Sequence, residues 1–184
     1  MHTDNTHSRL FLALPIPEAI GSELSSFTDA YLPSHTRRIA PADYHITLHF
    51  LADVDKKMQN TLEAAITAER WRCINEIRLH GTDSFPHILY ASVASNAELQ
   101  SLHDRLGTCL RAIGLAPEQR AYTPHITLAR AKQIGEAEHQ QWLDAGKQLP
   151  ALFWQPSHFC LYKSHLSHKG STYKILQQWP LTHG

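Results

Sequence analysis

The sequence lacks an excess of charge of either sign. Its 184 residues contain 17 Lys plus Arg and 17 Asp plus Glu, so the formal net charge is zero. Proteins that coat long nucleic acids usually carry a basic excess, because the phosphates they contact must be neutralised. The composition therefore argues against binding along an extended nucleic acid and leaves room only for a local contact.

Cysteine is also scarce. The three cysteines, Cys73, Cys109 and Cys160, form no C-x-x-C pair and cannot all be joined within one chain. Disulfide frameworks normally use an even number of cysteines and belong to oxidising compartments. We therefore expect reduced thiols and a cytoplasmic location.

A long hydrophobic run is missing near the start of the chain. The longest one there, Leu10 to Leu14, ends at Pro15, whereas a membrane-spanning helix needs about 20 apolar residues. Only Arg9 precedes this run as a positive residue, and no small-residue cleavage site follows it. We expect neither a membrane partner nor a signal peptide.

The first half of the chain has a clear order of elements. Apolar patterning predicts a strand over 9–14, a helix beginning at Glu18 and a second strand over 45–51. A further helix is predicted over 55–70.

The second half repeats this order. A strand is predicted over 88–94, a helix with Asn96 as its N-cap, and a strand over 125–130. Equivalent strands lie 80 residues apart, which indicates a duplicated lobe. The tail contains a strand over 158–163 and a last element, strand or short helix, that ends near Trp179.

A short motif is repeated at the same offset. The pattern His-x-Thr occurs at His45–Thr47, His80–Thr82 and His125–Thr127, and roughly one occurrence is expected by chance in this composition. The tetrapeptide HITL, with a chance expectation on the order of 0.01, occurs twice, at 45–48 and 125–128. The occurrence at His80 is interpreted as accidental, because Gly81 lacks the flanking apolar pattern.

Strand geometry explains why this motif suits phosphate chemistry. Side chains at i and i+2 share a face about 6.5–7 Å apart, so His45 and Thr47 point one way while Ile46 points into a core. His125 and Thr127 repeat the arrangement. One imidazole can act as base while the other acts as acid, and Thr hydroxyls can donate to phosphate oxygens. A charged and a neutral histidine predict a bell-shaped pH profile with limbs near roughly 5.5 and 8.

At these residues the chain resembles the two-histidine (2H) phosphoesterase superfamily, and within it the bacterial RNA 2′,3′-cyclic phosphodiesterase group, also called the 2′-5′ RNA ligase family. The similarity extends to RLFLALPIP, HITLHFLADV, TPHITLAR and KSHLSHKGSTYKILQQWPL. The resemblance implies an α+β fold, with a single bilobal domain over residues 1–184. Each of the two pseudo-symmetric lobes is an antiparallel sheet backed by helices, and the active site lies in the cleft between them.

The resemblance also implies an activity, which is hydrolysis of RNA 2′,3′-cyclic phosphate ends to 2′-phosphomonoesters without a metal or cofactor. It makes His45 the proton donor and His125 the proton acceptor, and it adds reversible 2′-5′ RNA ligation. The expected partners are RNA 3′ ends with a cyclic phosphate, tRNA fragments among them, and the expected state is a monomer. Thr47, Thr127 and Arg130 are the candidate substrate contacts.

Three positions complicate this assignment. The family often has Gly where this chain has Ala52, and a basic residue where it has Thr123. Strict alternation would put Arg130 on the same face as Ile126, away from the cleft, so a phosphate contact requires the strand to end or bulge there.

Aromatic residues could also stack on a terminal base, although core packing is the simpler expectation for each. The candidates for stacking are Phe11, Tyr44, Phe50, Tyr122 and Tyr173.

Three alternatives remain. A zinc hydrolase could use His45, His49 and His125, but strand residues i and i+4 lie about 13 Å apart, too far to share one zinc ion. A non-catalytic module could bind RNA ends or nucleotides on the same fold. A 2H phosphodiesterase could instead act on another cyclic phosphate.

Overall fold

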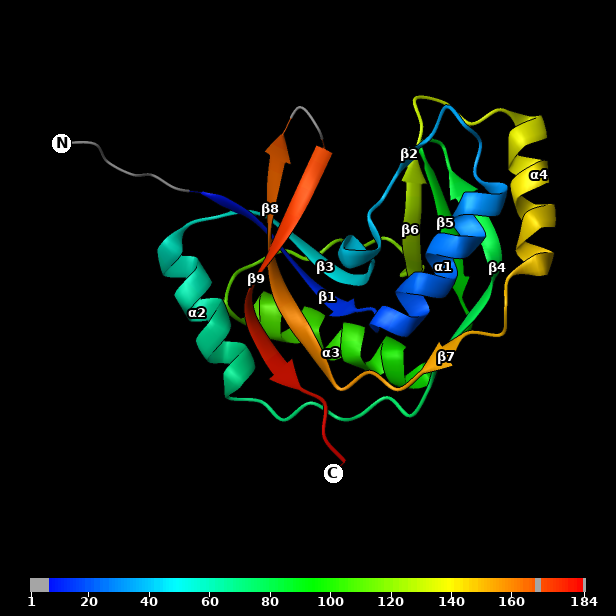
Figure 1. Ribbon diagram of the computed structural model, residues 1–184. Coiled ribbons are helices and arrows are strands. Elements are labelled where there is room, and N and C mark those ends of the chain that lie inside the picture. The colour runs from blue at the N-terminus through cyan, green and yellow to red at the C-terminus, as the bar shows by residue number, and fades with distance from the viewer. Residues whose placement is uncertain (1–6, 168–169, 184) are drawn as a thin grey trace.

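The computed structural model describes residues 7–167 and 170–183 (Figure 1). Over these residues the fold is mixed α+β, with a nine-stranded antiparallel sheet and four α-helices, which confirms the expected fold class. The strand order is β7-β4-β5-β6-β3-β1-β8-β9, and β2 pairs with β6. The elements are β1 (Ser8–Pro15), α1 (Glu18–Tyr31), β2 (Arg37–Arg38), β3 (His45–Val54), α2 (Lys56–Thr67), β4 (Ile77–Phe85), β5 (Ile88–Val93), α3 (Ala97–Ala112), β6 (His125–Arg130), α4 (Glu136–Ala145), β7 (Phe153–Trp154), β8 (His158–Ser167) and β9 (Gly170–Pro180).

The duplicated order of strand, helix and strand is present. In the first half β1 and α1 precede β3, which pairs with β1; in the second half β5 and α3 precede β6, which pairs with β5. The two half-sheets join where β3 meets β6, through the antiparallel pair Ile46 and Ile126. Both isoleucines are fully buried in the main core, on the face of the sheet that the helices cover. The opposite face carries a separate small cluster of Phe11, Ala13, Cys160 and Tyr162.

A β-bulge interrupts β3 just after the first motif. Thr47 pairs with Ala13 and His49 pairs with the adjacent Leu12, so Leu48 is an extra residue on β3. Such an extra residue inverts the alternation of the side chains that follow it. Leu48 and His49 are therefore both buried, and the next side chain, Phe50, is exposed.

The same bulge occurs in β6 at the equivalent position. Thr127 pairs with Tyr90 and Ala129 pairs with Leu89, which leaves Leu128 as the extra residue. Leu128 and Ala129 are both buried. The residue after them therefore faces the opposite side from the main core, and in β6 that residue is Arg130.

Other expectations are confirmed or completed. The amide of Leu99 donates to the Asn96 side chain at 2.8 Å, which confirms the N-cap of α3. The last element is the long strand β9, and the predicted helix at 55–70 is the shorter α2. The strands β2, β4 and β7 and the helix α4 were not predicted. In the described part of the chain, no helix is long and apolar enough to span a membrane.

Candidate active site

The two motif histidines are held in the same way. The Nδ1 atom of His45 lies 2.7 Å from the carbonyl oxygen of Asp43, and Nδ1 of His125 lies 2.7 Å from that of Thr123. A carbonyl oxygen can only accept, so Nδ1 carries the proton and donates in both cases. This tautomer leaves Nε2 of each neutral ring with a lone pair for proton transfer.

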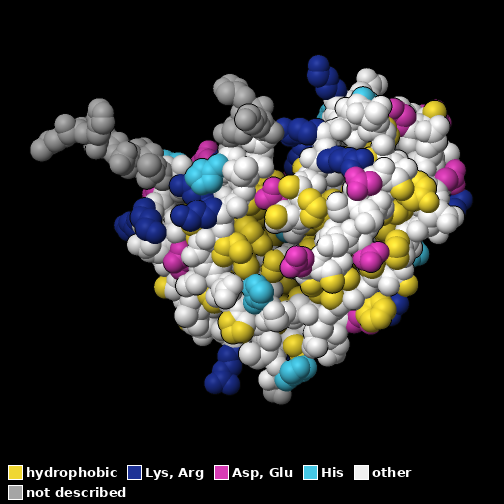
Figure 2. Space-filling view, viewed as in Figure 1, with side chains coloured by type: hydrophobic (Ala, Val, Ile, Leu, Met, Phe, Trp, Pro, Cys, Tyr) yellow, Lys and Arg dark blue, Asp and Glu magenta, His cyan; other side chains and the backbone are white. Residues whose placement is uncertain are grey.

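The pairing of β3 with β6 brings both motifs to one face of the sheet. Because Ile46 faces Ile126 in an antiparallel pair, the same register sets Thr127 beside His45 and Thr47 beside His125. The isoleucines point into the core, so the four motif side chains point to the opposite face. Figure 2 shows the surface hollowed between the β8–β9 hairpin and the half that contains β6, with hydrophobic side chains inside the hollow.

Burial controls the charge of the two histidines. Desolvation lowers the pKa of His45 from its usual value to about 4; the Asp43 carbonyl opposes this shift, and the positive charges of His125 and Arg130 add to it. Desolvation also lowers the pKa of His125, with the Thr123 carbonyl opposing it and Arg130 adding to it. Without a bound anion both rings are therefore neutral near pH 7, and a phosphate between them would favour protonation.

Arg130 points away from the main core, to the face of the motif histidines, an orientation that was expected only if the strand bulges. Strict alternation would have directed it to the core face, and the bulge at Leu128 reverses this. Its guanidinium lowers the pKa of both His45 and His125, which means that its charge lies close to both rings. The prediction from strict alternation, that Arg130 shares a face with Ile126, is therefore wrong.

Aromatic rings surround His45 in the first half. The ring of Phe11 lies 5.0 Å from that of His45 and stacks on Tyr162 at 5.0 Å, and Tyr173 meets both His45 and Phe11 edge-on. Phe50 approaches Phe11 at 5.8 Å and remains 55% exposed. Of the aromatic residues singled out from the sequence, Phe50 is thus the one with a large free face on the side of the site.

In the second half the aromatic neighbours of His125 are Tyr90, at 4.9 Å, and Phe85, at 5.2 Å. Sequence reasoning missed both of these rings, and it also missed Tyr162. Tyr90 lies within a predicted strand, but the side to which it points depends on the bulge in β6. Tyr44, by contrast, is buried in the main core, as core packing would predict.

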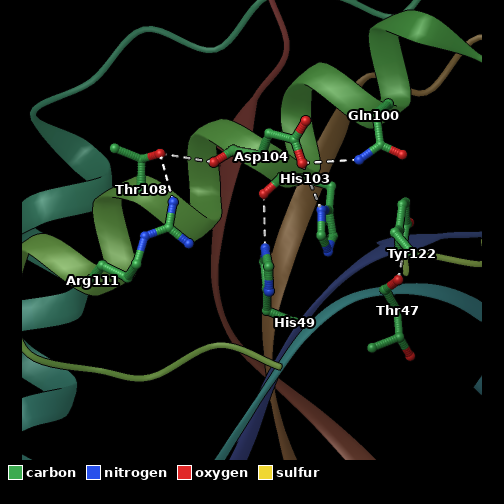
Figure 3. A network of polar contacts seen from close by, with 8 residues as sticks. All are labelled: Thr47, His49, Gln100, His103, Asp104, Thr108, Arg111 and Tyr122. Carbon is green, nitrogen blue, oxygen red and sulfur yellow. Dashed lines mark hydrogen bonds and ion pairs between the residues drawn. The ribbon is translucent and has the colours of Figure 1, made fainter. Parts of the chain in front are cut away.

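Tyr122 connects the segment before the second motif to Thr47 of the first motif (Figure 3). Its hydroxyl donates to the carbonyl oxygen of Thr47 at 3.1 Å, and its ring stacks on His103 at 4.0 Å. His103 stacks in turn on His49, whose Nε2 donates to the His103 carbonyl oxygen at 2.8 Å. Burial raises the pKa of the Tyr122 hydroxyl, which therefore stays a donor. Because Tyr122 lies three residues before His125, this contact holds the segment that leads into the second motif against the strand that carries the first motif.

This arrangement contradicts the zinc alternative. The bulge sends His49 to the buried face under α3, whereas His45 points to the opposite face, so these two rings do not converge on one ion. Among the residues that the structure describes, no group of three or more His, Cys, Asp or Glu side chains is placed to hold a metal ion.

The accidental motif at His80 lies elsewhere. It is in β4, which pairs with β5 and β7, and Gly81 interrupts the strand with a φ of +67°. Thr82 is buried, and its hydroxyl donates to the carbonyl oxygen of Trp142 in α4. His80 and Thr82 thus point into different environments from those of the two HITL motifs.

The fold and the paired motifs are those of a two-histidine phosphoesterase. The sequence matches the model of the 2′-5′ RNA ligase superfamily over residues 16–167, and the chain belongs to that family. A similar curated protein is an RNA 2′,3′-cyclic phosphodiesterase of Methanocaldococcus jannaschii, 28% identical over 93% of this chain and 99% of that protein. Another protein of that name, from Geobacillus stearothermophilus, is 31% identical over 95% of this chain and 57% of its own length.

Solved structures show the same fold. A crystal structure described as a phosphoesterase superposes with a TM-score of 0.80 at 22% identity, over 97% of this chain and 100% of the other. The structure of E. coli LigT complexed with 3′-AMP gives a TM-score of 0.79 at 21% identity, over the same shares of the two chains.

Proposed function

We propose that this protein hydrolyses RNA 2′,3′-cyclic phosphodiester ends to 2′-phosphomonoesters by acid–base catalysis between His45 and His125. The observation that carries the proposal is the matched orientation of the two imidazoles. Each donates Nδ1–H to a carbonyl two residues earlier, and each presents Nε2 on the same face beside a Thr. The names of the curated relatives support the same substrate class.

The reaction divides between the two rings. Neutral His125 takes a proton from water through Nε2 as the water oxygen attacks phosphorus. Protonated His45 gives its Nε2 proton to O3′ as the bond between phosphorus and O3′ breaks. A 2′-phosphate and a free 3′-hydroxyl result, and the rings return to their starting states by proton exchange with solvent. The near symmetry of the site does not choose between the two oxygens, and the assignment of donor and acceptor rests on the family resemblance.

The phosphate would be held by Arg130 and the two threonines. The guanidinium supplies planar, charged donors near both rings, and the hydroxyls of Thr47 and Thr127 supply neutral ones. The anion would also restore the positive charge that burial removes from His45, because an opposite charge within a few ångströms raises a histidine pKa. Phe50 is the candidate platform for the terminal base.

No Lewis acid is required in this scheme, because the two rings, one guanidinium and two hydroxyls supply the acid, the base and the oxyanion contacts. Hydrolysis should therefore be unchanged by EDTA. Loss of activity on chelation, with recovery on addition of zinc, would contradict the two-histidine mechanism.

Product analysis on cytidine 2′,3′-cyclic phosphate tests the proposal. Phosphorus NMR should detect only the 2′-phosphate. Exclusive 3′-phosphate would overturn the proposed ribose orientation but keep the histidine pair. Tight nucleotide binding without hydrolysis would favour the binding-module alternative, and turnover of only unrelated cyclic phosphates would favour a different substrate. RNA ligation in the reverse direction, tested with tRNA fragments, would exchange the roles of His45 and His125.

A further inference from the structure

A second pocket, which His183 also lines, lies in the helical layer, away from His45 and His125. It has a volume of about 540 Å³ and is built by three segments distant in the sequence. These are the residues that follow α2, the outer face of α3 and the carboxyl-terminal segment. The residues used below are Arg70, Trp71, Arg72, Ser101, Arg105 and Thr182.

Backbone hydrogen bonds hold the frame of this pocket together. Two backbone hydrogen bonds join the carboxyl-terminal segment to the residues after α2. The amide of Thr182 donates to the carbonyl oxygen of Trp71 at 2.9 Å, and the amide of Cys73 donates to the carbonyl oxygen of Thr182 at 2.9 Å. Trp71 is only 3% exposed and donates its indole N–H to the carbonyl oxygen of Ile66 at 3.0 Å. The floor is therefore a buried indole with no free face for a nucleobase.

Arg105 is fixed over this floor. Its guanidinium carbon lies 5.0 Å from the centroid of the Trp71 ring, and Nη2 donates to the Arg70 carbonyl oxygen at 3.0 Å. Glu69 approaches the same Nη2 at 3.6 Å. These contacts all involve Nη2 or the flat face of the group, so Arg105 can offer Nε–H and Nη1 as single donors to a ligand but not a two-pronged edge, because both such edges include Nη2.

Two more arginines add charge without a balancing acid. Within residues 7–167 and 170–183, neither the Arg70 nor the Arg72 guanidinium forms an ion pair, and no lining residue is acidic. The whole chain has a net charge of zero, so three arginines around one pocket are a local concentration of positive charge. Ser101 and Thr182 add hydroxyl groups at its wall.

From this arrangement we infer a second anion site, which binds two consecutive phosphate groups. Glu69 offsets the charge of Arg105, so the Arg70 and Arg72 guanidiniums remain to be balanced, with one phosphodiester charge for each. Arginine pairs best with phosphate oxygens in planar, two-pronged geometry. The buried indole excludes base stacking, so the ligand is read through its phosphates. Two sources carry this chemistry: a free diphosphate compound, or the backbone of the RNA whose end occupies the catalytic site. The second source rests on the proposed function.

Inorganic pyrophosphate is the probe for the site itself. In an NMR titration of the full chain, the Nε–Hε signals of Arg70, Arg72 and Arg105 should shift together along one saturating curve. The double variant R70Q/R72Q should weaken pyrophosphate binding about tenfold or more, because each charge-assisted contact contributes on that scale. Arg120, exposed and paired with Glu118, is the matched control, and R120Q should bind like wild type. Shifts no larger than those of the Arg120 signal, or no saturation, would overturn the inference.

Hydrolysis of cyclic-phosphate substrates of increasing length separates the two sources. If RNA supplies the phosphates, KM should fall as the RNA lengthens, and R70Q/R72Q should lose that gain while mononucleotide turnover is unchanged. If a free diphosphate is the ligand, KM should be the same in both proteins at every length, with pyrophosphate binding still present in wild type. Because the titration does not depend on turnover, an inactive enzyme would refute the proposed function without touching this inference.

Discussion

The two halves of the molecule share the features that acid–base chemistry needs and differ where a substrate would be oriented. Each half has a histidine held by a carbonyl two residues earlier, a threonine two residues later, and a bulge in the next position. After the bulge the first half presents Phe50 and the second half Arg130. The comparison suggests that the shared parts provide proton transfer, and that the aromatic and the cation decide which way round a nucleotide lies.

The largest expected effect tests the shared part. His45→Ala and His125→Ala should each lower kcat/KM for a nucleoside 2′,3′-cyclic phosphate by at least about 100-fold, the lower end for general acid–base catalysis. His80→Ala should leave kcat/KM unchanged, because β4 does not join the β3–β6 pair. Equal losses in all three variants would refute the assignment of the motifs.

Arg130→Gln tests the cation that only the second half has. It should lower kcat/KM by about 10- to 100-fold for every base, since a charge-assisted contact to the phosphate is lost. The same substitution removes a positive charge that lowers the pKa of both histidines, so the limbs of the pH profile should move to higher pH. An unchanged profile with unchanged kcat/KM would place Arg130 outside the site.

Phe50→Ala tests the aromatic that only the first half has. KM for nucleotide substrates should rise about tenfold, which is the scale of base stacking on an aromatic ring. An abasic ribose 2′,3′-cyclic phosphate serves as the matched substrate, and its KM should not change. If both substrates lost the same affinity, Phe50 would be supporting the site rather than contacting the base.

The pH profile distinguishes the empty site from the occupied one. The profile of kcat/KM reports the free enzyme, and burial lowers both histidine pKa values there, that of His45 to about 4. A histidine with a lowered pKa is already neutral at mildly acidic pH, so the kcat/KM window should lie below that expected for ordinary imidazoles. A bound phosphate raises both values, and the alkaline limb of kcat should lie about one pH unit or more higher. Measurement of both profiles between roughly pH 4 and 9 checks this; limbs that coincide would contradict it.

The smallest effect concerns a backbone difference between the halves. Ala52 has a φ of +57°, in the region that glycine occupies without strain. Ala52→Gly should therefore stabilise the protein by about 1 kcal/mol in urea unfolding. Ala64→Gly, at an exposed position inside α2, should destabilise by about the same amount. Destabilisation by both substitutions would contradict the strain at Ala52.

Local pattern was sufficient for the parts of the site that lie before the bulges. The repeated HITL predicted His45, Thr47, His125 and Thr127 on one face, because two-residue periodicity holds up to that point. The motif could not predict the face to which Arg130 points, since a bulge is decided by the pairing with β5 and not by the strand's own residues.

The unpredicted elements have equally specific reasons. In β4 the alternation is interrupted at Gly81, and in α4 a single residue, Trp142, is buried, so neither segment has a strong apolar period. The Tyr122 contact joins segments 75 residues apart, a distance over which no local pattern gives information. The aromatic neighbours of His125 were missed because their orientation depends on the same pairing as Arg130.

The pair Ile46 and Ile126 has one more consequence. Each residue faces its own counterpart 80 positions away, and this is the arrangement that a two-fold axis creates between identical subunits at an isologous interface. In a true homodimer any substitution appears on both sides of the axis, so both copies would carry Phe or both would carry Arg after the bulge. Because one chain supplies both halves here, the two sides can carry different residues. A catalytic frame that is otherwise two-fold symmetric can therefore distinguish the two orientations of a nucleotide.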